Sequence, residues 1–408
     1  MNDSIRTARQ AALDVLQPSA RDLDYGTRLH RESLVIDAYG FGATGLVRAA
    51  QINPLLEQQA SPQEIQDARE NEGMTSWATD EALFAEAAGA WEAAGVDCVW
   101  INAGEESSEL QTLFKRLARR LYAAELRRDF CPRAYRPDDI EAAKHGGRHC
   151  VYLTANGVAL PQRFVSVPDE LSFIRPLFQL GTRMAHLTYN RANLIGCGCG
   201  EPNDGGLTDL GRAVVAEMNR VGMIVDVAHS GLQTSLDAAR CSRRPMVASH
   251  TVCQALREHC RAKTDAVIRA IAATDGLVGI CCISSFLGRT WDIRALLDHI
   301  EHVVHTVGVD HVAIGTDVAY TPEAQAAESA KMKPAPRARE PWRSLWPEGS
   351  LQLPKEVPPS APLTLAWTNY PLFTVGLVQR GYSDADIRKI LGGNCLRVAR
   401  SLWDGRAA

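Results

Sequence analysis

The feature that most constrains the fold is a regular alternation of short β-rich runs with stretches of helical apolar spacing. Eight runs have strand character, and helix-like stretches such as residues 207–220 and 292–307 lie between most of them. Strands that alternate with helices predict parallel pairing through right-handed crossovers, and eight such units predict a closed (β/α)8 TIM barrel in the α/β class. The predicted strands are Leu34–Tyr39, Val96–Asn102, His149–Ala155, Met184–Tyr189, Met223–His229, Pro245–His250, Leu277–Ser284 and His311–Asp317.

Two regions lie outside this alternation. Residues 1–30 are predicted to form an N-terminal helical extension, and residues 31–408 to form the barrel as a single domain. Within the barrel, residues 321–362 form a long insertion rich in proline and alanine that carries Trp342 and Trp346. Long loops in compact domains are usually functional or disordered. Two interpretations of the insertion follow. It is a flexible segment, or it is a lid or subunit contact at the barrel mouth.

Composition excludes several classes of function. The 408 residues include 44 basic and 48 acidic side chains, so there is no basic excess of the kind that a broad nucleic-acid footprint requires. The apolar runs fall far short of the roughly 18–20 residues of a membrane span, and the N-terminus lacks the apolar core of a secretory signal. Eleven scattered cysteines favour reduced, buried thiols, and we interpret the Cys197–Cys199 pair as part of a glycine-rich loop. We expect a cytoplasmic protein that binds neither nucleic acid nor membrane.

Imidazole and carboxylate side chains end three of the predicted strands, where the active site of a β/α barrel lies. His229 and His250 end consecutive strands, and neighbouring strands are about 4.8 Å apart, so both imidazoles can reach one ion. Asp317 ends the last strand. Two histidines and one carboxylate with an open position form the usual catalytic zinc set, and imidazole also suits iron. The alternative is a pair of histidines that are hydrogen-bonded within the barrel core.

An arginine provides a candidate substrate contact. Arg261 follows His250 by eleven residues, and a guanidinium in that loop can form a bidentate contact with a substrate carboxylate. The alternative is an ordinary solvated loop arginine.

Five strings of the sequence resemble, in order, the membrane (renal-type) dipeptidase family, a branch of the amidohydrolase-type metal-dependent barrels. The strings are LGTRMAHLTYN, GLTDLGRAVVAEMNRVGMIVDVAHS, RPMVASHT, HVAIGTD and GYSDADIRKILGGNCLRVAR, and the similarity runs from about residue 34 to residue 400. The family hydrolyses dipeptides and related amides at a two-zinc site. The resemblance therefore implies a barrel with a metal-dependent hydrolytic centre.

Four positions match the functional residues of the family. By the resemblance, His229 and His250 hold one of the two metals. Asp317 falls on the aspartate that binds the other metal and handles the proton of the attacking water. Arg261 falls on the arginine that holds the carboxylate of the substrate.

Other positions depart from the family. The His-x-Asp pair that follows the first strand is replaced by Tyr39 and Phe41, and the carboxylate that bridges both metals is replaced by Ala155. A tyrosine must lose a proton of pKa about 10 to bind a metal well. We therefore predict that the first metal site is empty and that at most one ion, zinc or iron, binds. Tyr39 becomes a candidate substrate contact. Tyr189 replaces the histidine that stabilises the oxyanion, and its O–H can still donate a hydrogen bond there.

Three functions are consistent with these residues. The first is a metal-dependent hydrolase with a mononuclear site that acts on a small peptide-like amide. The second is a catalytically inactive dipeptidase-like barrel that binds a peptide-like ligand or a partner. The third is a redox enzyme, since two histidines and a carboxylate also form the facial triad of iron oxygenases. The resemblance further implies that the chain can form a homodimer, to which the insertion can contribute.

Overall fold

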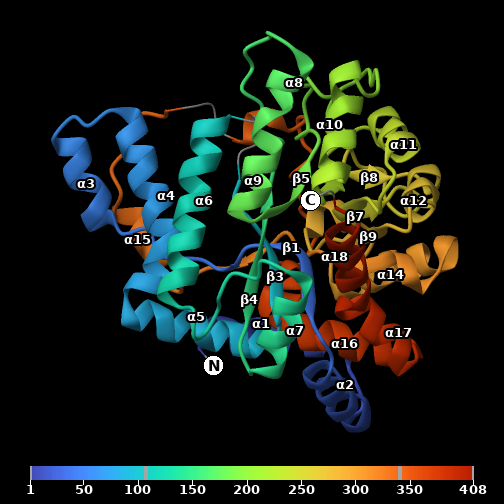
Figure 1. The fold of residues 1–408 in the computed structure, drawn as a ribbon. Coiled ribbons are helices and arrows are strands. Elements are labelled where there is room, and N and C mark those ends of the chain that lie inside the picture. Colours follow the sequence, from blue (N-terminus) through green and yellow to red (C-terminus); the bar gives the residue numbers. More distant parts are fainter. Residues whose placement is uncertain (1, 105–108, 339–341, 407–408) are drawn as a thin grey trace.

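Eight parallel strands form the centre of the molecule (Figure 1). The computed structural model describes residues 2–104, 109–338 and 342–406. The strands pair in the order in which they occur in the chain, so the predicted (β/α)8 architecture is confirmed. They are β1 (Ile36–Gly40), β3 (Cys98–Asn102), β4 (Cys150–Ala155), β5 (Thr182–His186), β6 (Ile224–Asp226), β7 (Val247–Cys253), β9 (Leu277–Ile280) and β10 (Val312–Ile314).

The two ends of the sheet meet between the last strand and the first. The main-chain N–H of Asp317 donates to the Tyr39 carbonyl oxygen at 2.9 Å, and that of Phe41 donates to the Val318 carbonyl oxygen at 3.3 Å. Just beyond, the short strands β2 (Gly42–Ala43) and β11 (Ala319–Tyr320) pair in parallel. The remaining short strand, β8 (Ala262–Lys263), pairs with β7. The closure brings Asp317 and Tyr39 together on the same rim of the barrel.

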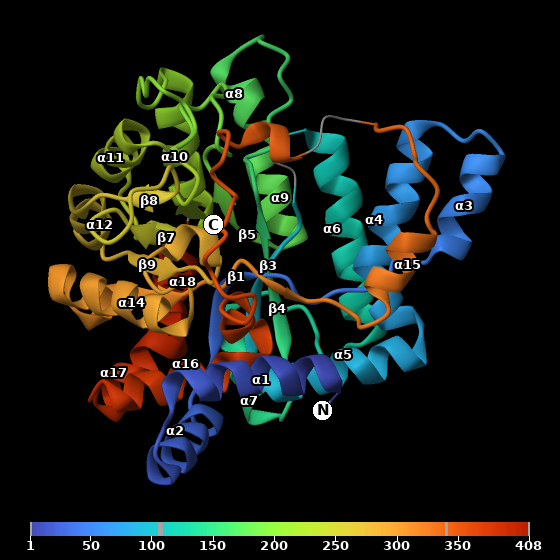
Figure 2. The ribbon, with the colours of Figure 1, turned by 180° about the vertical axis from the view of Figure 1, so that it is seen from behind.

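Helices surround the barrel on its outer side (Figure 2). Those of the first half are α3 (Ala49–Glu57), α4 (Pro62–Thr79), α5 (Glu81–Ala94), α6 (Leu110–Leu126), α7 (Pro137–His145), α8 (Val167–Glu170) and α9 (Ile174–Leu180). Those of the second half are α10 (Asp209–Val221), α11 (Leu232–Cys241), α12 (Asp265–Ala272), α13 (Ser284–Leu287), α14 (Ile293–Val307), α15 (Gln325–Lys331), α16 (Tyr370–Gln379), α17 (Asp384–Arg388) and α18 (Asn394–Asp404). No helix of the described residues is long and apolar enough to cross a membrane.

The N-terminal segment forms two helices, α1 (Asp3–Leu16) and α2 (Ala20–Glu32). Proline is unfavourable in a helix interior, and Pro18 lies between the two helices, while the Ser19 hydroxyl caps the second by accepting from a main-chain N–H. Both helices pack on C-terminal elements: Asn369 Nδ2 donates to the Ala8 carbonyl oxygen at 2.9 Å, and the buried His30 ring contacts the Thr374 hydroxyl at 2.8 Å. The segment is thus attached to the barrel.

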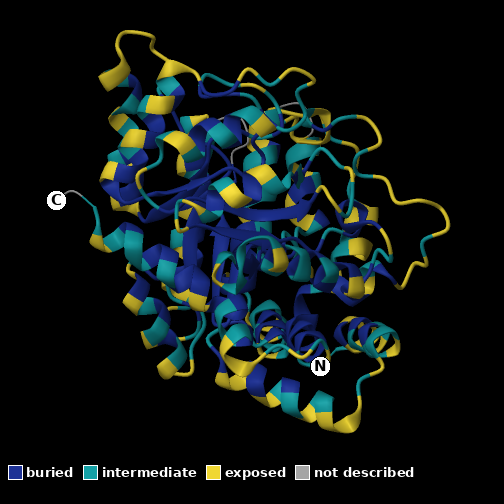
Figure 3. Ribbon diagram, turned by 90° about the vertical axis from the view of Figure 1, so that its right-hand side faces the viewer, coloured by how far each residue is buried: buried dark blue, intermediate teal, exposed yellow. Residues whose placement is uncertain are grey.

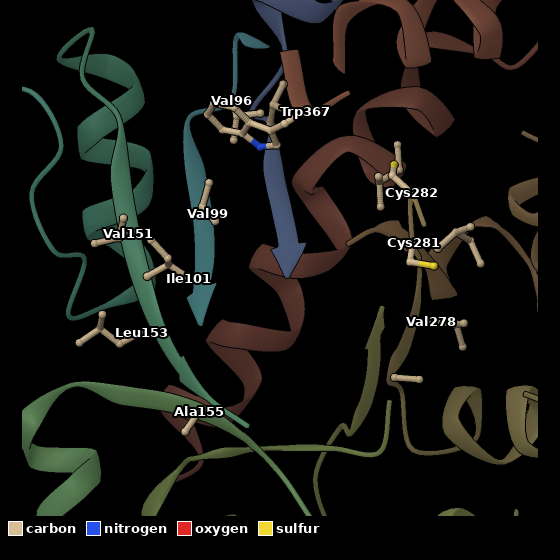
Figure 4. Close-up of a cluster of buried hydrophobic side chains, with 14 of the residues drawn as sticks. Val96, Val99, Ile101, Val151, Leu153, Ala155, Val278, Cys281, Cys282 and Trp367 are labelled. Carbon is tan, nitrogen blue, oxygen red and sulfur yellow. The ribbon is translucent and has the colours of Figure 1, made fainter. Parts of the chain in front are cut away.

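The strands are buried on both faces, as their nearly continuous apolar sequences predict (Figure 3). In β3, Val99 and Ile101 belong to the large cluster between sheet and helices, which Figure 4 shows in part. Their neighbours Cys98 and Trp100 belong to a second cluster that gathers residues from all eight strands and fills the barrel interior. The period of two along each strand therefore separates an inner core from an outer core.

Five of the predicted strand ends are wrong by three or four residues. β5 ends at His186 rather than Tyr189, and β6 ends at Asp226 rather than His229. β7 continues past His250 to Cys253, whereas β9 ends at Ile280 rather than Ser284 and β10 ends at Ile314, three residues before Asp317. The cause in β6 is local, because the Asp226 carboxylate accepts a hydrogen bond from the main-chain N–H of Ala228 at 2.8 Å and turns the chain out of the sheet. Tyr189 and His229 therefore lie in the loops that follow the strands.

Gly315 leaves room for a neighbouring strand. A Cβ atom at this position would lie 1.9 Å from the Ser249 carbonyl oxygen of β7. We expect Gly315→Ala to lower the free energy of unfolding by about 2–4 kcal/mol, because main-chain atoms of the sheet must move. Gly89→Ala in α5 is the matched control, since nothing lies within 4 Å of its added Cβ. Urea denaturation checks both, and the control is expected to be neutral or slightly stabilising.

Candidate metal and substrate site

A cavity of about 520 Å³ opens at the rim formed by the loops after the strands. Four residues predicted from the sequence line it, namely Tyr39, Tyr189, His229 and Asp317. The other lining residues come from neighbouring loops and from the insertion, and they are Phe41, Asn102, Asn156, Ile283, Ser285, Phe286, Trp342, Arg343, Trp346 and Leu351. The predicted residues His250 and Arg261 are fully buried and are not among these lining residues.

The two predicted histidines face one another. The Nε2 atoms of His229 and His250 are 3.0 Å apart. His229 Nδ1 lies 2.7 Å from Asn190 Oδ1, an acceptor, and therefore carries a proton. His250 Nδ1 lies 2.8 Å from the Ser249 hydroxyl, which gives its own proton to the Asp226 carboxylate at 2.5 Å, so this Nδ1 is a donor as well. Each neutral ring then presents an Nε2 lone pair to the other.

This pair fits a bound cation. Two lone pairs at 3.0 Å repel one another unless a positive ion lies between or beside them. Two nitrogens that bind one tetrahedral zinc at about 2.0–2.1 Å lie about 3.3 Å apart, close to the observed separation. Burial, with the neighbouring charge of Arg261 as the second cause, holds the pKa of both histidines well below its usual value. Both rings are thus neutral near pH 7, which is the form that binds a metal.

A second group of possible metal ligands shares His250 with this pair. Ligand atoms of His186, Asp226 and His250 all lie within 4.8 Å of one another, and all three residues are buried. His186 Nε2 is 2.8 Å from Asp226 Oδ2. The Asp226 carboxylate also accepts hydrogen bonds from the main-chain N–H groups of Ala228 and Ser249, at 2.8 and 3.1 Å, and from the Ser249 hydroxyl. Its oxygens are therefore engaged, and the carboxylate orients His250 through Ser249.

The Asp226 carboxylate stays ionised in this environment. Burial raises its pKa, but the charge of His186 and the hydrogen bonds from His186 and Ser249 outweigh it, and the pKa lies below its ordinary value. An ionised carboxylate behind a metal-binding histidine increases the basicity of that histidine.

Asp317 has a strained backbone and a perturbed carboxyl group. Its φ of 57° lies in the left-handed region, which is uncommon for residues other than glycine and is concentrated at functional sites. Burial raises the pKa of Asp317 to about 7, and the positive charge of Arg261 opposes this increase. A carboxyl group that titrates near neutral pH and lines a cavity suits general-base catalysis.

Arg261 does not extend into the cavity. Its guanidinium donates to the main-chain carbonyl oxygens of Ala228 and, at 2.8 Å, of His250. These bonds fix the loops that carry the histidine pair. Its assignment to a substrate carboxylate stays a prediction, since no atom of the side chain lines the cavity.

Two tyrosines cover the histidine rings. Tyr39 stacks on His250 with ring centroids 3.8 Å apart and an interplanar angle of 15°, and its hydroxyl is bonded to Asn156 Oδ1. Tyr189 stacks on His229 at 4.0 Å and 21°. Both tyrosines therefore restrict the orientation of the imidazoles from the cavity side.

The insertion contributes directly to the cavity. Trp346 is 8% exposed, and its ring contacts His229 edge-on at 5.9 Å and stacks on Phe286 at 5.4 Å. Earlier in the insertion, α15 is attached to α3, since Glu328 accepts a hydrogen bond from the main-chain N–H of Ala49. The described residues of the insertion therefore cover part of the barrel mouth.

Sequence reasoning missed several residues of the site, chiefly His186, Asn190, Asp226 and Ser249. The aspartate did leave a signal, because a carboxylate inside the apolar run MIVDVAH must find hydrogen-bond donors when it is buried. No such signal marks Asn190, which lies in a loop thirty-nine residues before His229 and meets it only in the folded chain.

These features define a class of protein, a (β/α)8 barrel with a histidine pair suited to a metal at the loops that follow its strands. The family model for membrane dipeptidase (Peptidase family M19) matches residues 116–331. The chain belongs to this family of metal-dependent peptidases.

A curated relative is similar to the chain in sequence, and two solved structures are similar to it in fold. The chain is 26% identical over 290 residues to the dipeptidase tcpJ of Claviceps purpurea (strain 20.1), covering 70% of this chain and 58% of that protein. It therefore spans little more than half the length of this curated relative. An amidohydrolase from Pseudomonas aeruginosa has a similar fold, with a TM-score of 0.68 at 24% identity over 93% of this chain and 99% of that one. A metallopeptidase from Rhodobacter sphaeroides, liganded with a phosphinate mimic of the dipeptide L-Ala-D-Ala, has a TM-score of 0.63 at 17% identity, over 91% and 100% of the two chains.

Proposed function

We propose that the protein hydrolyses a small peptide-like amide with the help of one zinc ion bound by His229 and His250. The observation that carries this proposal is the pair of Nε2 lone pairs that face one another at 3.0 Å, with both Nδ1 positions engaged as donors. We assign Asp317, which lines the cavity with His229, as the base. Its role as the third ligand stays a prediction from the sequence, since the described ligand atoms that lie within 4.8 Å of one another belong to His186, Asp226 and His250. When bound, zinc supplies a Lewis acid that polarises a carbonyl and lowers the pKa of water.

The side chains of the protein supply the remaining functions. Asp317, with a pKa near 7, accepts the proton of the attacking water and returns it to the leaving amine. The Tyr189 hydroxyl donates to the oxyanion that develops on the substrate. Tyr39, which also lines the cavity, contacts the substrate. The departures at Tyr39, Phe41 and Ala155 support one ion rather than two, since these residues replace the ligands of the other metal.

The compartment and the partners are also proposals. All eleven cysteines are free thiols, which supports a reducing, cytoplasmic location. We also propose that the protein binds a small peptide-like substrate and forms a homodimer, and that it binds neither nucleic acid nor membrane.

Metal analysis combined with an activity screen tests the proposed function. We expect about one equivalent of zinc by plasma mass spectrometry on protein purified without a histidine tag, and hydrolysis of some dipeptides or related amides. A chelator should abolish the hydrolysis, and added zinc should restore it. Two equivalents of metal would contradict the mononuclear site. One equivalent without hydrolysis of any amide would favour the inactive ligand-binding barrel.

A further inference from the structure

One wall of the cavity is a continuous aromatic surface. Trp346 stacks on Phe286 at 5.4 Å and 28°, and it meets Tyr189 edge-on at 6.4 Å and 88°. Trp342 meets Trp346 edge-on at 5.9 Å. Since Tyr189 in turn stacks on His229, the surface extends from the histidine pair to the rim that the insertion forms.

Trp346 has an unsatisfied donor. Its indole N–H is buried and has no hydrogen-bond partner among the described residues. Leaving a buried donor unpaired costs about 1–3 kcal/mol, so such groups are rare without a reason. The nitrogen is itself closed off from the cavity, so Trp346 offers a ligand its ring rather than its N–H.

The rest of the cavity is polar. Asn102, Asn156 and Ser285 are neutral polar lining residues, Asp317 is acidic and Arg343 is basic. A volume of about 520 Å³ lies within the range of small-molecule sites. A dipeptide with two methyl side chains leaves the aromatic wall exposed to water, whereas a substrate with a ring would cover it and gain the burial of that surface.

We propose that the substrate of this site is an amide with an aromatic or heteroaromatic side group, which packs against Tyr189, Phe286 and Trp346. This selectivity deepens the proposed function and rests on it for the chemical step. The recognition itself requires only the cavity wall.

Binding of two matched amides tests the recognition without turnover. The probes are N-acetyltryptophan amide and N-acetylalanine amide, titrated by ligand-observed NMR into zinc-loaded and chelator-treated protein. We expect the aromatic amide to bind at least about tenfold more tightly in both forms, as stacking and burial of a ring predict. Trp346→Ala should reduce this ratio to below about threefold.

Two further variants separate a specific effect from a loss of folding. Trp346→Phe keeps a ring at this position, so the preference for the aromatic amide should remain. Trp403→Ala removes a tryptophan that packs on Phe178, outside the lining of the cavity, and should leave the ratio unchanged. Equal affinities in the wild type, or an unchanged ratio in Trp346→Ala, would overturn the proposal. A retained aromatic preference in a protein that hydrolyses no amide would instead refute the proposed hydrolysis alone.

Discussion

Replacing His250 by alanine is expected to lower zinc affinity by about 10³-fold and to reduce hydrolysis to the background rate. The physical reason is that two imidazoles hold the ion. After the substitution a single imidazole remains, and too few protein ligands are left to bind zinc tightly. His229→Ala should have the same effect, because its Nε2 lies 3.0 Å from that of His250. Plasma mass spectrometry after dialysis against zinc of known free concentration measures the affinity, and kcat/KM measures the activity.

Two other histidine variants make this test specific. His186→Asn removes a donor of the inner group, which is His186, Asp226 and His250, but leaves the pair of His229 and His250, so it should retain about one equivalent of zinc. His299→Ala removes another buried histidine, whose ring contacts the main chain of Cys253 and Leu287. It should lower stability without changing the metal content. Loss of zinc in His186→Asn with retention in His229→Ala would place the ion in the inner group instead.

Replacing Asp317 by asparagine is expected to lower kcat by about 10²–10⁴-fold, the usual effect of removing a general base. In the wild type, kcat/KM should rise with pH through about 7, because the base must lose its proton and its pKa is raised to that value. The pH–rate profile measures this limb. A profile that stays flat from pH 5 to pH 8 would contradict the assignment of Asp317 as the base.

The same substitution should stabilise the fold at alkaline pH. The pKa of Asp317 is about 7 in the folded protein and about 3.9 in the unfolded chain, so the folded state binds the proton more tightly. Stability contributed by this group is present below pH 4 and is lost as the pH rises to 7. In chelator-treated protein, the free energy of unfolding of Asp317→Asn should therefore be about 2–4 kcal/mol higher than that of the wild type at pH 8. The two values should be equal near pH 4.

Urea denaturation at the two pH values checks this expectation. Asp24→Asn, at an exposed position of α2, is the control and should change stability little at either pH. An Asp317→Asn variant that is less stable than the wild type at pH 8 would show that the carboxylate is stabilised by a partner.

The barrel itself could be predicted from the sequence. Strands that are apolar on both faces and helices with one apolar face recur in strict alternation, and this local pattern admits few topologies. For the same reason, the positions of His229, His250 and Asp317 near the ends of the predicted strands indicated a site on one rim. These are properties of short segments, which the chain determines within ten or fifteen residues.

Only the tertiary structure decided how the site is assembled. Asn190 orients His229 across thirty-nine residues, and Asp226 orients His250 through Ser249. Trp346, in the insertion, contacts His229 across 117 residues of the chain. Arg261 matches a family motif, yet its guanidinium is bound to main-chain carbonyl groups. Such contacts depend on the packing of distant loops, and loops carry no periodic pattern that would reveal their neighbours. The sequence thus determined the scaffold and its reactive rim, whereas packing determined which side chains orient the histidines and which surface meets the substrate.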